Sequence, residues 1–90
     1  FKLYAPYPNP FNPRVNIEYS LPAAQKVVVE IYDLLGRSIR QLVNAPQQAG
    51  NYQLQWDGIT EQGAKAPSGI YFVRLQAKEQ VQIRKMALIR

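Results

Sequence analysis

Four prolines crowd the first 13 residues of this 90-residue chain, and they constrain its fold more than any other feature. They are Pro6, Pro8, Pro10 and Pro13. Each proline fixes φ and lacks an amide donor, so this segment belongs neither to a helix nor to a central strand. Two aromatic residues, Tyr7 and Phe11, lie within it. We therefore predict that residues 1–14 form an extended strap, which crosses the surface and buries both rings.

The length of the chain sets its organisation. Ninety residues suffice for one hydrophobic core and leave no room for a second, so we predict a single domain with residues 15–90 as its body. The absence of Cys excludes disulfides and thiolate metal sites. The chain begins at Phe1 and has no apolar run of membrane-spanning length. We expect it to be part of a longer precursor whose targeting signal lies upstream.

Short segments of alternating apolar and polar residues follow the strap. They predict strands at 15–21, 27–31, 38–44, 52–56, 69–75 and from 81 onward. Residues 33–36 predict a tight turn, and 46–50 and 59–68 predict loops. Ile39 and Leu42 are out of phase, which predicts a bulge near Arg40 and Gln41. The apolar phase of the last strand is expected to switch around Lys85, which would bury both faces of its end.

These strands, with no helical period between them, determine the fold class. They predict an all-β protein, an immunoglobulin-like antiparallel β-sandwich of about six to seven strands.

The inventory of reactive side chains argues against catalysis. The chain has no His, so the usual agent of proton transfer near neutral pH is missing. Of its six acidic residues, Glu18, Glu30 and Asp33 fall on outward strand positions or in a turn. We therefore expect no enzymatic activity, no catalytic residues and no cofactor.

Two local features admit an alternative interpretation. Asp57, Thr60 and Glu61 in the loop 57–63 offer oxygen ligands for Ca²⁺, but three side chains are too few, and we favour a turn in which Asp57 accepts backbone hydrogen bonds. Trp56 and Tyr52 resemble a stacking platform for sugars or bases. Their alternation with Gln favours core packing. The net charge of +5 is spread along the chain, and we expect no nucleic-acid partner.

The order of short motifs resembles the type IX secretion C-terminal sorting domain (type A), a family similar to the immunoglobulin-like domain of the flagellar hook-capping protein. The motifs are YPNPFNP at 7–13, IEYSLP at 17–22, IYDLLGR at 31–37, AG at 49–50, WDG at 56–58, Gly63, SGIYF at 68–72 and KMALIR at 85–90. Each motif is weak, but the ordered set covers nearly the whole chain.

The resemblance implies a non-catalytic signal at the end of a larger exported protein. Its partners would be the type IX translocon, a sortase-like processing enzyme and the cargo domain linked to its N-terminus. It would pass through the periplasm to the cell surface or the medium.

A signal read in the folded state needs an exposed edge strand that recruits partners through backbone hydrogen bonds. The candidate recognition residues are Lys85, Met86, Ala87, Leu88, Ile89 and Arg90. The alternative for them is a purely structural last strand.

Two other functions stay open. One is a structural assembly module that associates with further copies through an edge strand. The other is a carbohydrate-binding module of a secreted hydrolase, which requires solvent-exposed rings at Trp56, Tyr52 and Tyr71.

Overall fold

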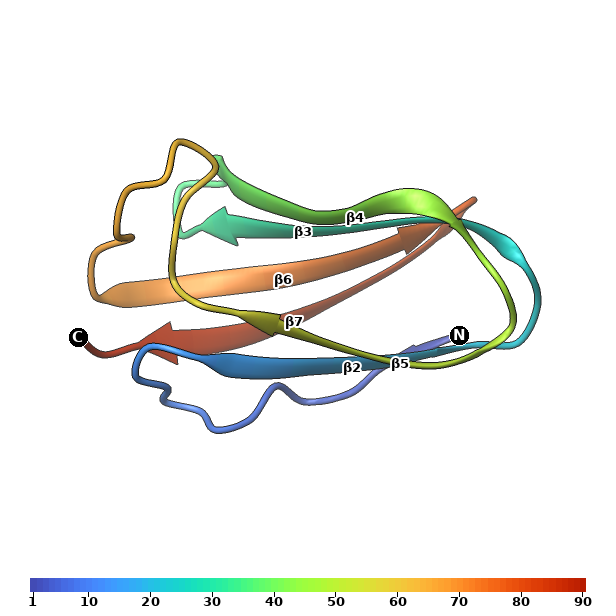
Figure 1. The fold of residues 1–90 in the computed structure, drawn as a ribbon, viewed down its shortest axis with the longest axis horizontal. Helices are drawn as coiled ribbons and strands as arrows, with labels where there is room; N and C mark the ends of the chain where they lie inside the picture. The colour runs from blue at the N-terminus through green and yellow to red at the C-terminus, as the bar shows by residue number, and fades with distance from the viewer.

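The computed structural model describes residues 1–90 as seven strands without a helix (Figure 1). The strands are β1 (Lys2–Leu3), β2 (Val15–Leu21), β3 (Gln25–Asp33), β4 (Ser38–Gln47), β5 (Gly50–Trp56), β6 (Gly69–Ala77) and β7 (Gln80–Leu88). The chain therefore has no helix that is long and apolar enough to span a membrane.

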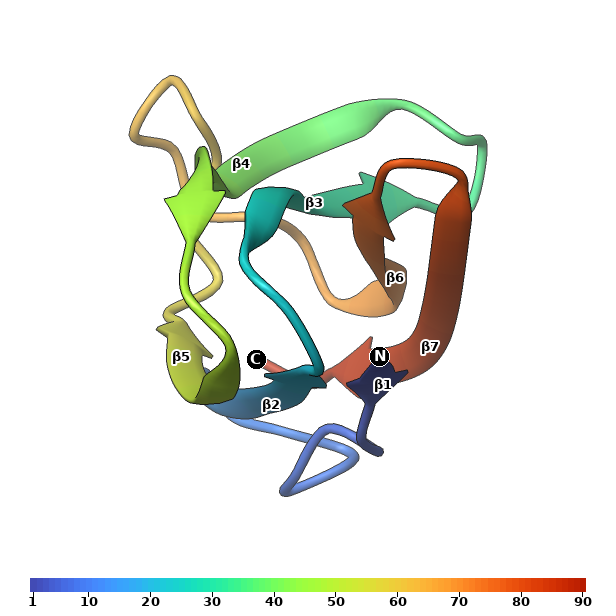
Figure 2. The same cartoon turned by 90° about the vertical axis from the view of Figure 1, so that its right-hand side faces the viewer.

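The strands form two sheets that face each other. One has the order β1-β2-β5 and the other the order β4-β3-β6-β7, and all neighbours are antiparallel (Figures 1 and 2). The predicted all-β, immunoglobulin-like sandwich is confirmed. The extra strand relative to the six clear sequence patterns is β1, which has two residues and lies inside the strap.

A single cluster of 17 buried apolar residues fills the space between the sheets. It follows the predicted alternation, since Val15, Ile17 and Tyr19 in β2 are fully buried while the residues between them are half-exposed. Trp56 is the largest member, and its ring lies 5.3 Å from that of Tyr71 in an edge-on arrangement. Burial of such large rings contributes strongly to stability.

Strand β4 contains the predicted irregularity. Its pairing with β3 shifts register on both sides of Arg40 and Gln41, so Leu42 and Ile39 are extra residues. These two bulges bring both side chains to the half-buried side of the strand, which explains their odd spacing. The predicted loop at 46–50 is longer than the observed connection, because β4 continues to Gln47 and β5 begins at Gly50. Pro46 is tolerated there because β4 is an edge strand.

The predicted phase switch in the last strand is present, since Val81 and Ile83 lie on one face and Met86 and Leu88 on the other, but the expected burial of both faces of its end is wrong, because Ile89 is 53% exposed. Pairing of β7 with β6 runs without a register shift, so Val81 and Ile83 lie on the outer face, 43% and 56% exposed. The intervening Gln82 and Arg84 take the positions that face the strap. Gln82 accepts a hydrogen bond from Leu3 N, and Arg84 Nε donates to Leu3 O. Polar residues replace apolar ones here because they hold the backbone of the strap.

The strap is partly as predicted. Phe11 is 1% exposed, and its ring lies 5.8 Å from that of Trp56, whereas Tyr7 is 47% exposed, contrary to the prediction that both rings are buried. The Tyr7 hydroxyl instead donates a hydrogen bond to the Glu18 carboxylate, which raises the pKa of Tyr7. With Leu3 also fully buried, the strap contributes side chains to the same core as the body.

Candidate functional site

The predicted recognition segment 85–90 forms the end of β7 and the residues after it. Met86 and Leu88 point into the core and are 0% and 1% exposed. The surface of the segment therefore consists of Lys85, Ile89 and Arg90, with Ala87 half-buried.

The outer edge of this segment is not open, contrary to the sequence-based expectation. The Asn9 side chain donates to Lys85 O at 3.1 Å and accepts from Ala87 N at 3.0 Å, as the backbone of a neighbouring strand would. Phe11 N then donates to Ala87 O, and Ile89 N donates to Phe11 O, both at 2.9 Å. The strap thus occupies the backbone groups that a partner strand would need.

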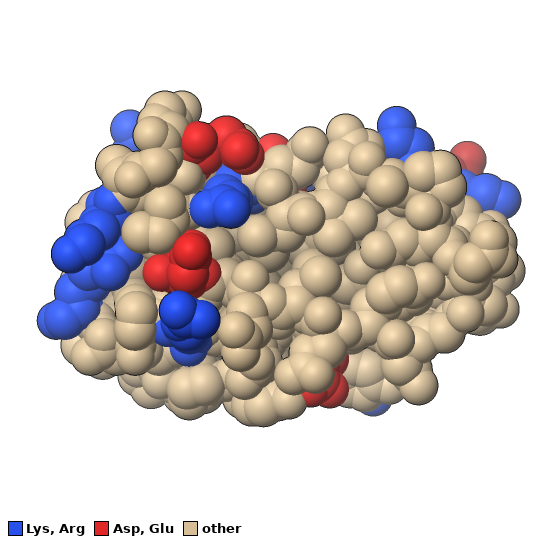
Figure 3. Space-filling model, viewed as in Figure 1, with Lys and Arg blue, Asp and Glu red and all other residues tan.

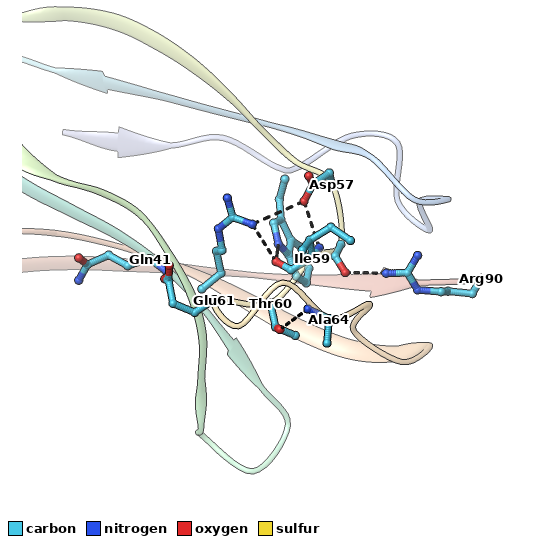
Figure 4. A network of polar contacts seen from close by, with 10 residues as sticks. Gln41, Asp57, Ile59, Thr60, Glu61, Ala64 and Arg90 are labelled. Carbon is cyan, nitrogen blue, oxygen red and sulfur yellow. Dashed lines mark hydrogen bonds and ion pairs between the residues drawn. The ribbon is translucent and has the colours of Figure 1, made fainter.

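The last residue fastens the chain end to the loop that joins the two sheets. Arg90 Nη2 donates to Gly58 O at 2.5 Å (Figure 4), and its Nε donates to Ala66 O at 2.7 Å. Its backbone N–H donates to the Ser68 hydroxyl at 2.8 Å. This guanidinium therefore satisfies carbonyl groups of the loop and is not free to bind a partner with these donors.

Gly58 permits this arrangement. It has φ +75°, and a Cβ atom there would lie 2.8 Å from Arg90 Nη2 and 3.3 Å from Pro13 O. Gly63 has a similar φ of +86°, but a Cβ atom placed there would have no other atom within 4 Å. Both glycines have a backbone conformation that would strain any other residue, but only Gly58 is also crowded.

Substituting Gly58→Ala is expected to lower the free energy of unfolding by about 1 kcal/mol more than Gly63→Ala, because only the former also crowds Arg90. Chemical denaturation monitored by Trp56 fluorescence measures both. Equal losses would mean that the contact with Arg90 does not hold the chain end in solution.

The outer face of the four-stranded sheet carries an open, mainly apolar groove of about 430 Å³. Its lining includes Tyr32, Leu34, Phe72, Arg74 and Ile83. In the sheet register the exposed residue Lys85 lies directly opposite Phe72, which lines the groove. Apolar surface beside a free cation is therefore the part of this face best suited to bind a partner.

Polar contacts fix the shape of the groove. The hydroxyl of Tyr32 donates to Glu30 Oε1 at 2.8 Å, and Arg74 Nη1 lies 3.3 Å from the same hydroxyl. Burial, followed by the hydrogen bond to Glu30, raises the pKa of Tyr32. The phenol therefore stays neutral and holds its hydrogen bonds at physiological pH.

Asp33 organises the turn at the rim of the groove. Its Oδ1 accepts hydrogen bonds from the backbone N–H groups of Leu35 and Arg37, and its Oδ2 pairs with Arg37 Nε at 2.8 Å. The Arg37 N–H is the main cause of the lowered pKa of Asp33. The turn holds Leu34 and Leu35 in solvent, 68% and 78% exposed. Sequence reasoning missed this surface, although two adjacent leucines in a turn were a signal for it.

The loop after Trp56 is held by its own side chains (Figure 4). Asp57 Oδ1 accepts from Ile59 N at 3.0 Å, which confirms the predicted turn. Thr60 accepts from Ala64 N, and Glu61 accepts from Gln41 N. Each ligand expected of a Ca²⁺ site thus has a separate structural partner, and no group of three acidic side chains converges.

The proposed sugar platform does not exist at Trp56. This ring is 1% exposed and donates from Nε1 to Ile59 O at 3.0 Å, and Tyr71 is 4% exposed. Tyr52 is half-buried and stacks on Tyr19 at 5.2 Å. These rings pack in or against the hydrophobic core, as their alternation with Gln predicted.

Charged side chains are unevenly distributed. On the side where β4 and β5 form the sheet edges, most of them gather near the end that holds the C-terminus, a few lie at the opposite end, and the middle of the face is uncharged (Figure 3). The sequence contains no charged residue from Gln41 to Trp56. This uncharged stretch includes all of β5 and most of β4.

These features define an immunoglobulin-like sandwich with a strap across one side. The chain belongs to the FlgD Ig-like domain family, whose model matches residues 12–80. The match omits most of the strap and most of β7, the two segments that bind each other. No curated protein matches the chain.

Solved structures extend the likeness. Dimeric latent PorU from Porphyromonas gingivalis is 23% identical with a TM-score of 0.72, over 93% of this chain and 9% of PorU. PorZ from the same organism, described as an essential surface component of the type IX secretion system, is 26% identical with a TM-score of 0.68, over 98% of this chain and 11% of PorZ.

FlgD from P. aeruginosa is 23% identical with a TM-score of 0.65, over 82% of this chain and 59% of that protein. The chain thus spans about a tenth of PorU and PorZ. All three share its fold.

Proposed function

We propose that this domain is a non-catalytic sorting signal of type A, which directs a larger exported protein through the type IX translocon to the cell surface. The observation that carries the proposal is the likeness to PorZ over 98% of the chain. That likeness extends beyond the residues 12–80 matched by the FlgD family model, into the strap and β7. The ordered motifs at both ends support the same assignment.

The shape of the domain suits this role. The two termini lie at opposite ends of a body that measures 37 × 23 × 20 Å (Figure 1). A cargo linked before Phe1 would leave at one end, and the opposite end, where basic side chains gather, would face the translocon (Figure 3). A sortase-like enzyme that removes the domain would act on the cargo side of the strap.

The recognition surface in this proposal is a face and not a strand edge. The strap occupies the backbone of residues 85–89, so a partner would read the exposed side chains of Lys85 and Ile89 together with the apolar groove at Phe72. Lys85 is the residue of choice for a test because its side chain has no hydrogen-bond or ion-pair partner in the chain.

A reporter with a signal peptide, fused to residues 1–90 in a type IX-competent bacterium, tests the proposal. We expect surface display, and we expect Lys85→Glu to reduce it at least about tenfold, because reversing a charge at a complementary contact costs more than about 1.4 kcal/mol. Surface labelling of the reporter gives the measurement.

The matched control is Lys26→Glu, which makes the same charge change at an exposed position of β3, far along the sheet from Lys85. It should leave display unchanged. Full display of both variants would remove Lys85 from the recognition surface. Periplasmic retention of the folded, unmodified fusion would contradict the sorting function itself.

A structural assembly module remains the second candidate, because one edge strand of the sandwich is open and uncharged.

A further inference from the structure

The sandwich has four strand edges, and they are not equally protected. The strap covers the end of β7, and Gln82 and Arg84 bridge β7 to β1. The first half of β4 is covered by the loop, where Glu61 N donates to Ile39 O and the Glu61 carboxylate accepts from Gln41 N. The edge of β5 has no such cover.

The alternation of backbone hydrogen bonds along β2 shows which N–H and C=O groups of β5 are free. Asn16 exchanges both backbone hydrogen bonds with Tyr7, and Glu18 O accepts from Tyr4 N, so these β2 residues point toward the strap. Their neighbours in β2 point toward β5 and pair with Tyr52, Leu54 and Trp56. The backbone N–H and C=O groups of the alternate residues in β5 therefore point away from the sheet. These residues are Asn51, Gln53 and Gln55.

Nothing in the chain blocks this edge. Neither backbone group of Asn51, Gln53 or Gln55 has a hydrogen-bond partner, and the pairing of β5 with β2 has no bulge. The strand contains no proline and no charge; in the neighbouring strand β2, Glu18 lies opposite Gln53 and accepts the hydrogen bond of the Tyr7 hydroxyl. Natural sheets normally protect such edges with charged residues, proline or bulges. An unprotected, regular edge is a template for strand addition.

The chemistry of the edge matches a copy of itself. Residues 51–55 alternate between amide and apolar side chains, and the order of these two types is the same in both directions from Gln53. In an antiparallel pair centred on Gln53, each Asn51 would face a Gln55, and each Tyr52 would face a Leu54. The free backbone groups belong to Asn51, Gln53 and Gln55, so these residues can form the hydrogen-bonded pairs of such a ladder.

We propose that two copies of this chain associate through β5, antiparallel about a twofold axis at Gln53, and form one continuous sheet of the order β1-β2-β5-β5-β2-β1. The exposed amides would pair across the outer face, while the half-buried Tyr52 and Leu54 would lose water-accessible surface. The net charge of +5 opposes association, so added salt should strengthen it. This inference does not depend on the sorting function.

Sedimentation equilibrium of the 90-residue chain over a range of concentrations tests the proposal. We expect a reversible dimer, and we expect Gln53→Lys to weaken it at least about tenfold, because two like charges would meet on the twofold axis. Gln62→Lys adds the same charge in the exposed loop after β5 and should leave the dissociation constant within about twofold.

A charge-pairing experiment identifies the twofold geometry. Gln53→Glu alone should weaken association in the same way, whereas an equimolar mixture with Gln53→Lys should restore it, because opposite charges then meet. Failure of the mixture to associate would overturn the proposed axis.

Amide hydrogen exchange locates the contact without any substitution. Protection of Asn51, Gln53 and Gln55 should rise with protein concentration, while that of Lys78 in the turn between β6 and β7 should not. A chain that is strictly monomeric at about 1 mM, or a dimer that Gln53→Lys leaves intact, would overturn the inference.

Discussion

Replacing Phe11 with Ala is expected to destabilise the domain by about 3–5 kcal/mol, a large part of the 5–15 kcal/mol typical of a whole domain. The ring is 1% exposed and lies against Trp56, so its removal leaves a cavity in the core. The backbone of Phe11 also bonds Ala87 and Ile89, so loosening it weakens the cover of β7. Urea denaturation monitored by Trp56 fluorescence measures the loss.

The control for this substitution is Tyr7→Ala in the same strap. Tyr7 is 47% exposed, and its hydroxyl contacts a carboxylate at the surface, so we expect a loss of about 1 kcal/mol or less. Similar losses for both substitutions would mean that the strap does not insert Phe11 into the core.

Removing residues 85–90 is expected to abolish cooperative folding. The truncation deletes Met86 and Leu88, which are 0% and 1% exposed, and each such deletion costs about 2–5 kcal/mol. It also removes the partners of Asn9 and Phe11 in the strap and all three hydrogen bonds of Arg90. Near-ultraviolet circular dichroism and a thermal melt would report the loss of fixed packing.

A full-length chain with Lys85→Ser and Ile89→Ser separates the two roles of this segment. Both side chains are exposed, so we expect the melting transition to persist with a change of about 1 kcal/mol or less. A truncated chain that melted as cooperatively as this control would refute the structural role of β7.

These two results bear on how the sorting function is tested. A truncation that abolishes secretion would not separate a lost signal from a lost fold. Substitutions at exposed positions such as Lys85 change the surface and leave Met86 and Leu88 in the core. Surface display of such variants therefore reports on recognition.

The local sequence predicted most of the strand pattern correctly. Alternation identified the buried face of β2, β3 and β6, and the unusual spacing of Ile39 and Leu42 identified the bulged region of β4. Asp57 was correctly placed as a turn residue, since Asp accepts nearby backbone hydrogen bonds in its own loop. These features depend on residues that lie close together in the chain.

The last strand was only partly predicted because its environment is made by distant residues. Its pattern did not show that Val81 and Ile83 face outward, because the alternate positions are occupied by Gln82 and Arg84, which bind the strap. The hydrogen bonds between β7 and the strap join residues 76 to 81 positions apart. Periodicity carries no information about such partners.

The sequence by itself determined that this chain folds as an all-β sandwich with a proline-rich strap, because strand alternation, turn residues and proline geometry are local properties. Only the tertiary structure decided that the strap closes the edge of β7 and that β5 stays open. The physical reason is that a backbone group is free or occupied according to which segment lies beside it, and that depends on how both sheets pack around one core.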